Sequence, residues 1–455
     1  NLTLDTVSNT WSLTIPNGSE LAEGSYDVVA TDSDAAGNAV SDSTTGEIII
    51  DTTVPAVAPT VDSATTNDTT PVITGTATLD IGETLSVVVN SQTYTVGDGN
   101  LVDNGNNTWS LTIPSGSELG EGSYDVVATV SDAAGNTVND STAGEIVIDT
   151  TAPAVAPTVD SVTTNDTTPV ITGSATLGTG ETLSVVVDGA TYTVGDGNLV
   201  DNGNNTWSLT IPSGSELTEG SYDVVATVSD AAGKAVIDST TGEIVIETTQ
   251  PIAPTVDSFS DDTGITGDNI TSDNVPAFSG TAEANSTVEV FLNGASLGTV
   301  TANGTGDWSL SYGGVPLADN TYNVTATSTD AAGNSTSSVA PLIVTIDANA
   351  PIAPTITTPI EGDNLISAAE QGDVLVAGTA EANATIDGTI SDGTNDVTAQ
   401  VTANSTGAWT LTGSELDVST LTDGPLTVRA TATDAAGNVS TPVTASVDKD
   451  AAVPA

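Results

Sequence analysis

The chain of 455 residues carries 60 acidic residues against three basic ones, a formal net charge of −57 at pH 7, and it contains no cysteine, histidine or methionine. Nucleic acid needs a basic surface to bind, so the charge excludes it as a partner, and the same sign disfavours an anionic membrane surface. The sequence contains no run of 18 apolar residues that would predict membrane insertion. The missing residue types exclude cysteine and histidine nucleophiles, disulfides and most zinc, copper, haem and iron-sulfur ligand sets, which leaves hard cations bound by oxygen.

The sequence repeats with a period of about one hundred residues. The five tryptophans, from Trp11 to Trp409, stand 98, 98, 101 and 101 residues apart, and a D-A-A-G-N or D-A-A-G-K motif recurs at almost the same step. Proline-rich boundaries of the form I-D-T-T-x-P predict short, stiff joints between repeats. We therefore expect a truncated first repeat at 1–53, its C-terminal half only, full repeats at 54–151, 152–249, 250–349 and a divergent 350–450, and the start of a further linker at 451–455.

Within each repeat, short segments rich in valine, threonine and isoleucine lie between glycine, asparagine and aspartate turns, which is typical of β-strands. In the second repeat we expect strands at 70–77, 84–90, 93–96, 108–113, 123–130 and 145–148. Alternation puts Trp109, Leu111 and Ile113 in the core, which favours core packing of the tryptophans over a sugar-binding role. The expected fold class is all-β, a tandem array of immunoglobulin-like seven-stranded β-sandwiches forming an elongated rod. The first repeat lacks its front strands and would expose an apolar face, so we expect the chain to be a segment of a longer protein.

A tyrosine follows a glycine or asparagine turn at the start of the penultimate strand, the position of a tyrosine corner in immunoglobulin-like folds. Tyr124 ends L-G-E-G-S-Y, and Tyr26, Tyr222 and Tyr322 occupy the same place in their repeats. The fifth repeat has Leu426 there instead. That corner must therefore be built differently.

These patterns together resemble a family, the tandem bacterial immunoglobulin-like repeats of giant biofilm-associated and repeats-in-toxin surface adhesins. The residues that carry the resemblance are N-D-T-T-P-V-I-T-G-T-A at 67–77, the segments 274–294, 307–311 and 317–334 of the fourth repeat, and the I-D-T-T joints. The resemblance implies extender domains, exported to the cell surface by type I secretion, that hold a terminal ligand-binding module away from the cell. It also implies Ca²⁺ where domains meet, and an acidic loop at 260–271 adds Asp262 and Asp268 as weaker candidate ligands.

Topology supplies a separate argument for the acidic residues. In a seven-strand sandwich the D-A-A-G-N loop lies at the N-terminal end of a repeat, whereas the tyrosine corner and the I-D-T-T joint lie at its C-terminal end, so stacking brings three acids together at each joint. We define them as the corner acid, the joint acid and the loop acid. In that order they are Glu23, Asp51 and Asp132 at the first joint, Glu121, Asp149 and Asp230 at the second, Glu219, Glu247 and Asp330 at the third, and Asp319, Asp347 and Asp434 at the fourth.

Clustered carboxylates repel one another unless a cation joins them. Ca²⁺ accepts six to eight oxygens in flexible geometry, so it is preferred to Mg²⁺, which requires a tighter octahedral shell. Two alternatives stay open: the D-A-A-G-N loop could be a tight turn without a metal, and the joint acids could be solvated linker residues. Lys234 replaces the asparagine in the third repeat, which argues that the fifth position of the motif is not a side-chain ligand there.

Three functions fit this sequence. The first is a mechanical spacer in a cell-surface adhesin that serves adhesion or biofilm formation, a monomeric rod whose partners are its neighbouring repeats and, through other domains, an unknown surface ligand. The second is direct binding of a carbohydrate or protein by the fifth repeat, at the insert 388–403. The third is a subunit of an extracellular filament or surface layer. An enzyme is not expected, because a serine-histidine-aspartate triad cannot form without histidine and no carboxylate pair stands apart from the repeating acids.

Overall fold

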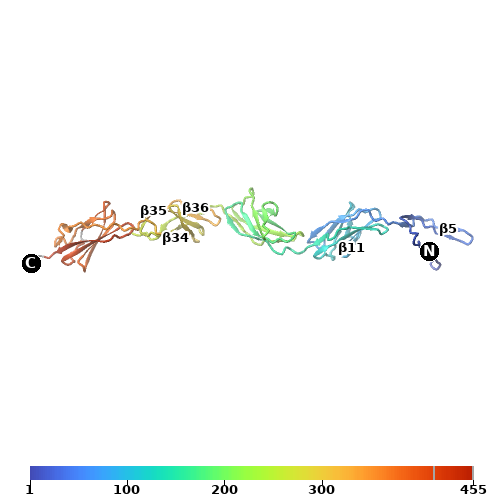
Figure 1. Ribbon diagram of the computed structural model, residues 1–455, viewed down its shortest axis with the longest axis horizontal. Coiled ribbons are helices and arrows are strands. Elements are labelled where there is room, and N and C mark those ends of the chain that lie inside the picture. Colours follow the sequence, from blue (N-terminus) through green and yellow to red (C-terminus); the bar gives the residue numbers. More distant parts are fainter. Residues whose placement is uncertain (413–415, 453–455) are drawn as a thin grey trace. The chain divides into compact units, whose positions relative to one another are not determined.

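The computed structural model describes residues 1–412 and 416–452, so residues 453–455 of the expected linker lie outside the described residues. Strands dominate the described chain, joined by turns and by short 3₁₀ segments such as η1 (Ile360–Gly362) (Figure 1). No helix in these two ranges is long and apolar enough to span a membrane. The chain divides into two compact units, Asn1–Ser161 with Val170–Ser215 and Tyr222–Glu243, and Val162–Pro169 with Glu216–Ser221 and Ile244–Ala455.

The second repeat contains two four-stranded sheets, β7-β9-β13-β12 and β11-β10-β15-β16, and a three-stranded sheet, β8-β17-β14. Pairing is antiparallel except between β8 and β17, which run parallel. The strands are β7 (Thr60–Val61), β8 (Ala64–Thr66), β9 (Val72–Thr76), β10 (Thr84–Val89), β11 (Gln92–Thr95), β12 (Leu101–Asp103), β13 (Thr108–Thr112), β14 (Gly122–Tyr124), β15 (Val126–Ser131), β16 (Thr137–Asn139) and β17 (Ile146–Ile148).

The strand expected at 123–130 is wrong as a single element, because the ladder breaks at Asp125. β14 pairs with β17, whereas β15 pairs with β10 in a different sheet. Two carboxylates replace the backbone bonds at the break: Glu145 Oε2 accepts the Val126 N–H at 3.0 Å, and Asp125 Oδ1 accepts the Gly144 N–H at 2.7 Å. We name this arrangement the carboxylate clip.

The core of the second repeat forms around Trp109, which is 1% exposed. Leu111 and Ile113 are buried beside it, so the expected inward set is confirmed. The indole packs on Gly75, where a Cβ would lie 2.0 Å from the Thr60 carbonyl oxygen and 2.6 Å from Trp109 Cζ2. Glycine is therefore required wherever a strand crosses the tryptophan, and Trp207, Trp308 and Trp409 are buried in the same way.

The tyrosine corner expected from the sequence is present, for example at Tyr26, Tyr124 and Tyr322. The hydroxyl of Tyr124 donates to the Gly120 carbonyl at 3.0 Å, and those of Tyr26 and Tyr322 donate to the carbonyls four residues upstream at 2.9 Å. In the fifth repeat Leu426 is 1% exposed and simply joins the core. Burial of an aliphatic side chain thus replaces the hydroxyl bond there.

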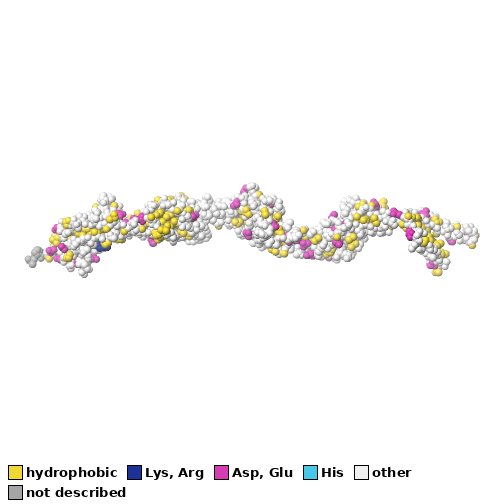
Figure 2. All heavy atoms as spheres, viewed as in Figure 1, with side chains coloured by type: hydrophobic (Ala, Val, Ile, Leu, Met, Phe, Trp, Pro, Cys, Tyr) yellow, Lys and Arg dark blue, Asp and Glu magenta, His cyan; other side chains and the backbone are white. Residues whose placement is uncertain are grey.

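The first repeat leaves its apolar side chains at the surface. Trp11 is 48% exposed, against 1% for Trp109, and Leu13, Ile15 and Val29 are also exposed (Figure 2). The exposed apolar face expected from the sequence is thus present. The strands are β1 (Leu2–Asp5), β2 (Thr10–Leu13), β3 (Gly24–Tyr26), β4 (Thr31–Ser33), β5 (Ala39–Ser41) and β6 (Ile48–Ile50), paired as β1-β2, β3-β6 and β4-β5.

The third repeat is divided between the two compact units. The first unit holds the sheets β18-β20-β24-β23 and β22-β21-β26-β27, and the sheet β19-β28-β25 has β19 and β28 in the second unit. The strands are β18 (Thr158–Val159), β19 (Val162–Thr164), β20 (Val170–Ser174), β21 (Thr182–Val187), β22 (Ala190–Thr193), β23 (Leu199–Asp201), β24 (Thr206–Thr210), β25 (Gly220–Tyr222), β26 (Val224–Ser229), β27 (Ala235–Ile237) and β28 (Ile244–Ile246).

In the fourth repeat the penultimate strand is unbroken. β35 (Asn320–Thr329) pairs with β32, β36 and β37 in one sheet, β30-β37-β35-β32-β33, and the other sheet is β29-β31-β34; β34, β35 and β36 are labelled in Figure 1. The remaining strands are β29 (Ser258–Phe259), β30 (Ile270–Thr271), β31 (Ala277–Thr281), β32 (Thr287–Leu292), β33 (Ala295–Thr301), β34 (Asp307–Ser311), β36 (Ser335–Ser337) and β37 (Leu342–Ile346).

The fifth repeat has a five-stranded sheet, β38-β44-β43-β40-β41, and a two-stranded sheet, β39-β42. Its penultimate strand, β43, is also continuous, and no carboxylate clip interrupts it. The strands are β38 (Leu365–Ser367), β39 (Val376–Thr379), β40 (Thr385–Ser391), β41 (Asp396–Thr402), β42 (Ala408–Leu411), β43 (Gly424–Thr433) and β44 (Val443–Asp450).

Candidate cation sites at the joints between repeats

The D-A-A-G-N loop is a turn closed by its own aspartate. Asp132 Oδ1 accepts the backbone N–H groups of Ala134, Gly135 and Asn136 at 2.9, 2.8 and 2.9 Å, and Gly135 supplies the positive φ of +95°. The pKa of Asp132 is lowered, mainly by the hydrogen bond from the Asn136 side-chain amide. Burial acts in the opposite direction, but the side-chain and backbone hydrogen bonds together outweigh it. The turn expected from the sequence is therefore present, and most of the oxygen lone pairs of the loop acid are already used inside the loop.

The asparagine of the motif also reaches across the joint. Asn136 Nδ2 donates to Asp132 Oδ2 at 2.8 Å and to the Asp51 carbonyl of the preceding repeat at 3.0 Å. Asn334 and Asn438 donate in the same way to the carbonyls of Glu247 and Asp347, at 2.9 and 2.8 Å. We name this contact the asparagine latch. It joins the loop acid of one repeat to the joint acid of the repeat before it.

A second contact runs in the opposite direction. Asn67 Nδ2 of the second repeat donates to the Ala232 carbonyl in the D-A-A-G-K loop of the third, at 2.9 Å, and the Asn165 N–H donates to the Ala332 carbonyl at 3.0 Å. The alanines of the motif thus present bare carbonyls to the neighbouring repeat. At the fourth joint the longer loop 260–271 takes this role, because Thr263 Oγ1 donates to the Ala436 carbonyl at 2.6 Å.

The corner acids are tied to the residues that follow the joint acids. Glu121 Oε2 accepts the hydroxyls of Thr150 and Thr151 at 2.9 and 2.7 Å, and Glu23 and Glu219 hold the equivalent threonines. These hydroxyl bonds lower the pKa values of the three glutamates. At the fourth joint, Asp319 accepts the N–H of Ala348 at 2.9 Å and the side-chain amide of Asn349. Corner and joint acids therefore share one C-terminal end, as expected.

Two of the joint acids, Glu247 and Asp347, have raised pKa values, so their charged forms are disfavoured. Burial, followed by the nearby carboxylates of Asp330, Glu283 and Glu219, raises the pKa of Glu247. Burial is also the main cause that raises the pKa of Asp347, with Asp434 and Asp319 adding repulsion against a backbone hydrogen bond from Asn349. At the third and fourth joints, the predicted corner and loop acids therefore add to the effect of burial on the joint acid.

Comparison with known families settles what these repeats are. The family model for a bacterial Ig-like domain matches residues 59–150, 157–248 and 249–348. The chain belongs to the bacterial Ig-like family. A second model, for a bacterial Ig domain, matches residues 363–449 of this Ig-like chain, and a third, for group 3 of the bacterial Ig-like domains, matches residues 10–92.

Solved structures similar to this bacterial Ig-like chain include two adhesin segments. A Ca²⁺-stabilized adhesin with which an Antarctic bacterium binds ice is 29% identical, covers 87% of this chain with 100% of its own, and has a TM-score of 0.33. A tetra-tandem repeat from the extending region of a large adhesion protein is 28% identical with the same coverage and TM-score. A titin I-band fragment is 12% identical over 66% of this chain and 98% of its own, with a TM-score of 0.27. None of the curated proteins compared matches the chain.

The carboxylate and carbonyl oxygens at the joints are of the type that binds a hard cation, but the described residues do not place enough carboxylates together to form a complete metal site. Within residues 1–412 and 416–452, no group of three or more acidic side chains lies close enough together to hold a metal. Four carboxylate oxygens of the described chain are nevertheless buried without a hydrogen-bond partner. Glu145 Oε1 and Glu243 Oε1 lie inside the second and third repeats, whereas Asp230 Oδ2 lies at the second joint and Asp262 Oδ1 beside the fourth. Asp230 is the loop acid whose motif has Lys234 in place of asparagine, so its outer oxygen lacks the amide that Asp132 has. Asp268 accepts the Ile270 N–H at 2.9 Å within its own loop.

Sequence reasoning predicted three acids at each joint but missed the N–H donors that connect the repeats there. Asn136, Asn334 and Asn438 bind the preceding repeat, and Asn67 and Asn165 bind the following one. The available signal was the recurrence of asparagine at the fifth position in four of the five motifs, but it could not identify the partner, which is a backbone carbonyl.

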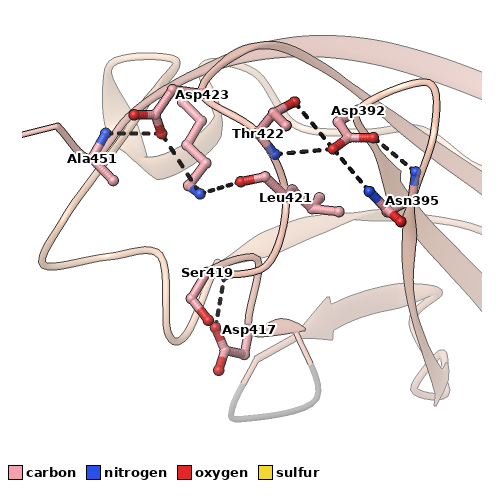
Figure 3. Close-up of polar contacts among 9 residues, drawn as sticks. Asp392, Asn395, Asp417, Ser419, Leu421, Thr422, Asp423 and Ala451 are labelled. Carbon is pink, nitrogen blue, oxygen red and sulfur yellow. Dashed lines mark hydrogen bonds and ion pairs between the residues drawn. The ribbon is translucent and has the colours of Figure 1, made fainter.

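The insert of the fifth Ig-like repeat folds as the β40–β41 hairpin. A shallow depression of about 610 Å³ lies over it, lined by Asp387, Thr389, Thr398 and Gln400 among others. The amide of Gln400 donates to Asp387 at 2.8 Å. Asp392 in the hairpin turn accepts the N–H and the hydroxyl of Thr422 at 2.9 and 3.1 Å (Figure 3). These bonds, with those from Thr394 and Asn395, hold the pKa of Asp392 far below its ordinary value.

Proposed function

We propose that this chain is a structural extender, a spacer segment of a large bacterial cell-surface adhesin that serves adhesion or biofilm formation. Its Ig-like repeats carry no chemistry of their own, and other domains of the protein bind the surface ligand. The segment lies outside the cell after type I secretion and acts as a monomeric rod. Folds of this kind host many functions, so the proposal depends on the joints rather than on the sandwich itself.

The single observation that carries the proposal is the recurring pair of opposed contacts at successive joints. An asparagine latch runs backward from one repeat to the joint acid of the repeat before it, and a loop of the earlier repeat donates forward to an alanine carbonyl of the later one. A spacer needs each repeat to hold its neighbour in one orientation, and two contacts from opposite sides restrict rotation about the joint more than either alone. A freely hinged array of binding modules would not need them.

We propose further that Ca²⁺ binds at these joints and stiffens them. The ligands would come from the corner, joint and loop acids: Glu23, Asp51 and Asp132; Glu121, Asp149 and Asp230; Glu219, Glu247 and Asp330; and Asp319, Asp347 and Asp434, with Asp262 and Asp268 as weaker candidates. A bound Ca²⁺ supplies two positive charges and six to eight positions for oxygen. The raised pKa values of Glu247 and Asp347 support this choice, because a cation would offset both the burial and the repulsion that raise them.

Small-angle X-ray scattering of the full chain, in millimolar Ca²⁺ and in chelator, tests the proposal. We expect a longer and stiffer particle with Ca²⁺ and a higher melting temperature, because an ion that binds only the aligned joint stabilises it by mass action. A variant with Glu219→Gln, Glu247→Gln and Asp330→Asn should lose part of both effects. Identical scattering profiles and melting curves in the two conditions would exclude calcium-dependent stiffening, and a compact particle in both would exclude the spacer.

Direct ligand binding by the fifth repeat is the second candidate, favoured by the depression over the β40–β41 hairpin. A glycan array probed with the full chain and with Gln400→Ala separates the two functions. Binding that the substitution abolishes would support a ligand module. Sedimentation over a range of concentrations separates a monomeric rod from a subunit of a filament or surface layer.

A further inference from the structure

The fifth repeat has a buried lysine at a place where the other repeats have an isoleucine. Gly424 pairs with Lys449, as Gly122 pairs with Ile148 and Asn320 with Ile346. Ile148 and Ile346 are each 1% exposed, and Lys449 is 4% exposed. The ammonium group therefore enters the C-terminal end of the repeat, directly before Asp450, which occupies the position of a joint acid.

The ammonium group of Lys449 contacts a backbone carbonyl and a carboxylate at this end of the repeat. Its Nζ donates to the Leu421 carbonyl and lies 3.6 Å from Asp423 Oδ1 (Figure 3). Asp423 precedes Gly424 as Glu121 precedes Gly122, so it is the corner acid of the fifth repeat. The pKa of Asp417 is lowered mainly by two hydrogen bonds from Ser419, and the positive charge of Lys449 makes a smaller contribution in the same direction. The lysine thus neutralises the acid that the other repeats direct toward a joint.

The neighbouring oxygen donors are also missing. Where Thr150 and Thr151 donate hydroxyls to Glu121, the fifth repeat has Ala451 and Ala452. Among the described residues, Asp423 accepts a backbone N–H from Ala451 at 3.3 Å and no hydroxyl. Two changes therefore coincide at one end: a positive charge enters, and two hydroxyl oxygens leave. Both reduce the attraction of this end for a hard cation, since an ammonium repels a divalent ion and Ca²⁺ requires many oxygens.

We propose that Lys449 is a built-in counter-cation, which replaces a bound divalent ion at the C-terminal end of the fifth repeat and keeps that end ordered without calcium. This inference rests on the proposed calcium-dependent joints. A buried ammonium is costly unless it is paired and hydrogen-bonded, and here the carboxylate and the carbonyl meet both conditions. Because the charge is covalently attached, its occupancy does not change with the calcium concentration around the protein.

Hydrogen-exchange mass spectrometry on the full chain, in millimolar Ca²⁺ and in chelator, tests the proposal. For wild type we expect chelation to speed exchange at least threefold in peptides covering 146–151 and 342–349, and to leave 443–452 unchanged. The variant Lys449→Ile with Ala451→Thr and Ala452→Thr restores the residue types of the other repeats. In this variant, exchange at 443–452 should become calcium-dependent, by a smaller factor than at 342–349, because only the corner acid Asp423 and the joint acid Asp450 supply carboxylates in the chain tested.

Each failure has its own pattern. If wild-type residues 443–452 respond to chelation as strongly as 342–349, or if the triple variant stays indifferent to Ca²⁺, the counter-cation proposal is wrong. If no joint of wild type responds, the proposed calcium-dependent function fails instead, whatever the fifth repeat does. The variant Lys449→Met, uncharged and of similar length, guards against misfolding: with unchanged far-ultraviolet circular dichroism it should exchange faster at 443–452 in both conditions.

Discussion

Asn334 donates one hydrogen bond to Asp330 in its own loop and one to the Glu247 carbonyl of the preceding repeat. Replacing it with alanine removes both, and a hydrogen bond contributes about 0.5–1.5 kcal/mol net. We expect Asn334→Ala to speed amide exchange severalfold at 244–249 and at 330–337, measured by mass spectrometry.

Asn38→Ala is the matched control, because the described contacts of the Asn38 amide stay within its own loop, on Asp34. It should speed exchange in that loop alone. Equal effects of the two substitutions on their own loops, with no change at 244–249 in Asn334→Ala, would mean that the latch does not hold the joint.

Gly280 lies under the indole of Trp308, and a Cβ there would lie 2.1 Å from the Thr255 carbonyl oxygen and 2.9 Å from Trp308 Cζ2. Gly280→Ala should therefore destabilise the fourth repeat by about 1–3 kcal/mol through overpacking. Gly304→Ala in the same repeat meets no atom within 4 Å and serves as the control. Exchange rates of β31 and β34 measure the difference; a loss no larger than that of the control would contradict the tight packing.

At the scale of elements, the carboxylate clip explains why β14 and β15 are separate strands. Glu145 is 3% exposed and accepts the Val126 N–H, so Glu145→Ala leaves a buried donor unpaired, at about 1–3 kcal/mol. Glu145→Gln keeps an acceptor oxygen and should lose less. Urea unfolding of both variants measures the order, and equal losses would show that the acceptor at this position does not matter.

Strand positions could be predicted from alternation, but the break at Asp125 could not. The residues 123–130 alternate without a glycine or proline, and the atoms that interrupt the ladder belong to Glu145 and Gly144, which are distant in sequence. The visible signal was a glutamate in the G-E-I phrase of the first three repeats, absent from the fourth and fifth. The role of this glutamate cannot be predicted without knowing which strands pair.

At the joints, too, one part of the arrangement could be proposed from the sequence and another part could not. The prediction of which acids share a joint rests on topology alone, because loop order fixes the end of the sandwich at which each acid lies. Topology could not predict the asparagine latch, since the Asn438 amide meets a backbone carbonyl 91 residues away. Backbone carbonyls have no sequence signature. The exact ligands of a metal depend on side-chain rotamers and stay a prediction.

At the scale of the whole molecule, the net charge of −57 makes joint stability depend on protons. The folded pKa values of Glu247 and Asp347 lie above their ordinary 4.5 and 3.8, so proton uptake favours the aligned joint, and this stabilisation is lost as the pH rises through the folded values. In chelator, we expect exchange at the third and fourth joints to slow as the pH falls from 7 toward 4.5.

The corner acids behave oppositely. Glu23 and Glu121 have lowered pKa values, so the stability that they contribute is present above the ordinary 4.5 and is lost only as the pH falls further. The first two joints should therefore show no slowing over the same range, after correction for the intrinsic pH dependence of exchange. Glu247→Gln should remove the response at the third joint alone; a response that survives in this variant would assign it to another group.

In the second to fifth repeats, the last strand pairs in parallel with a strand from the N-terminal part of the repeat, and this pairing has a mechanical consequence. In the second repeat β8 lies near the N-terminal boundary and runs parallel to β17 at the C-terminal boundary, and β38 and β44 pair likewise in the fifth. Tension applied through the two boundaries draws such strands along each other in shear, so their hydrogen bonds must break together rather than one after another. A tether under flow would resist extension at these short ladders first.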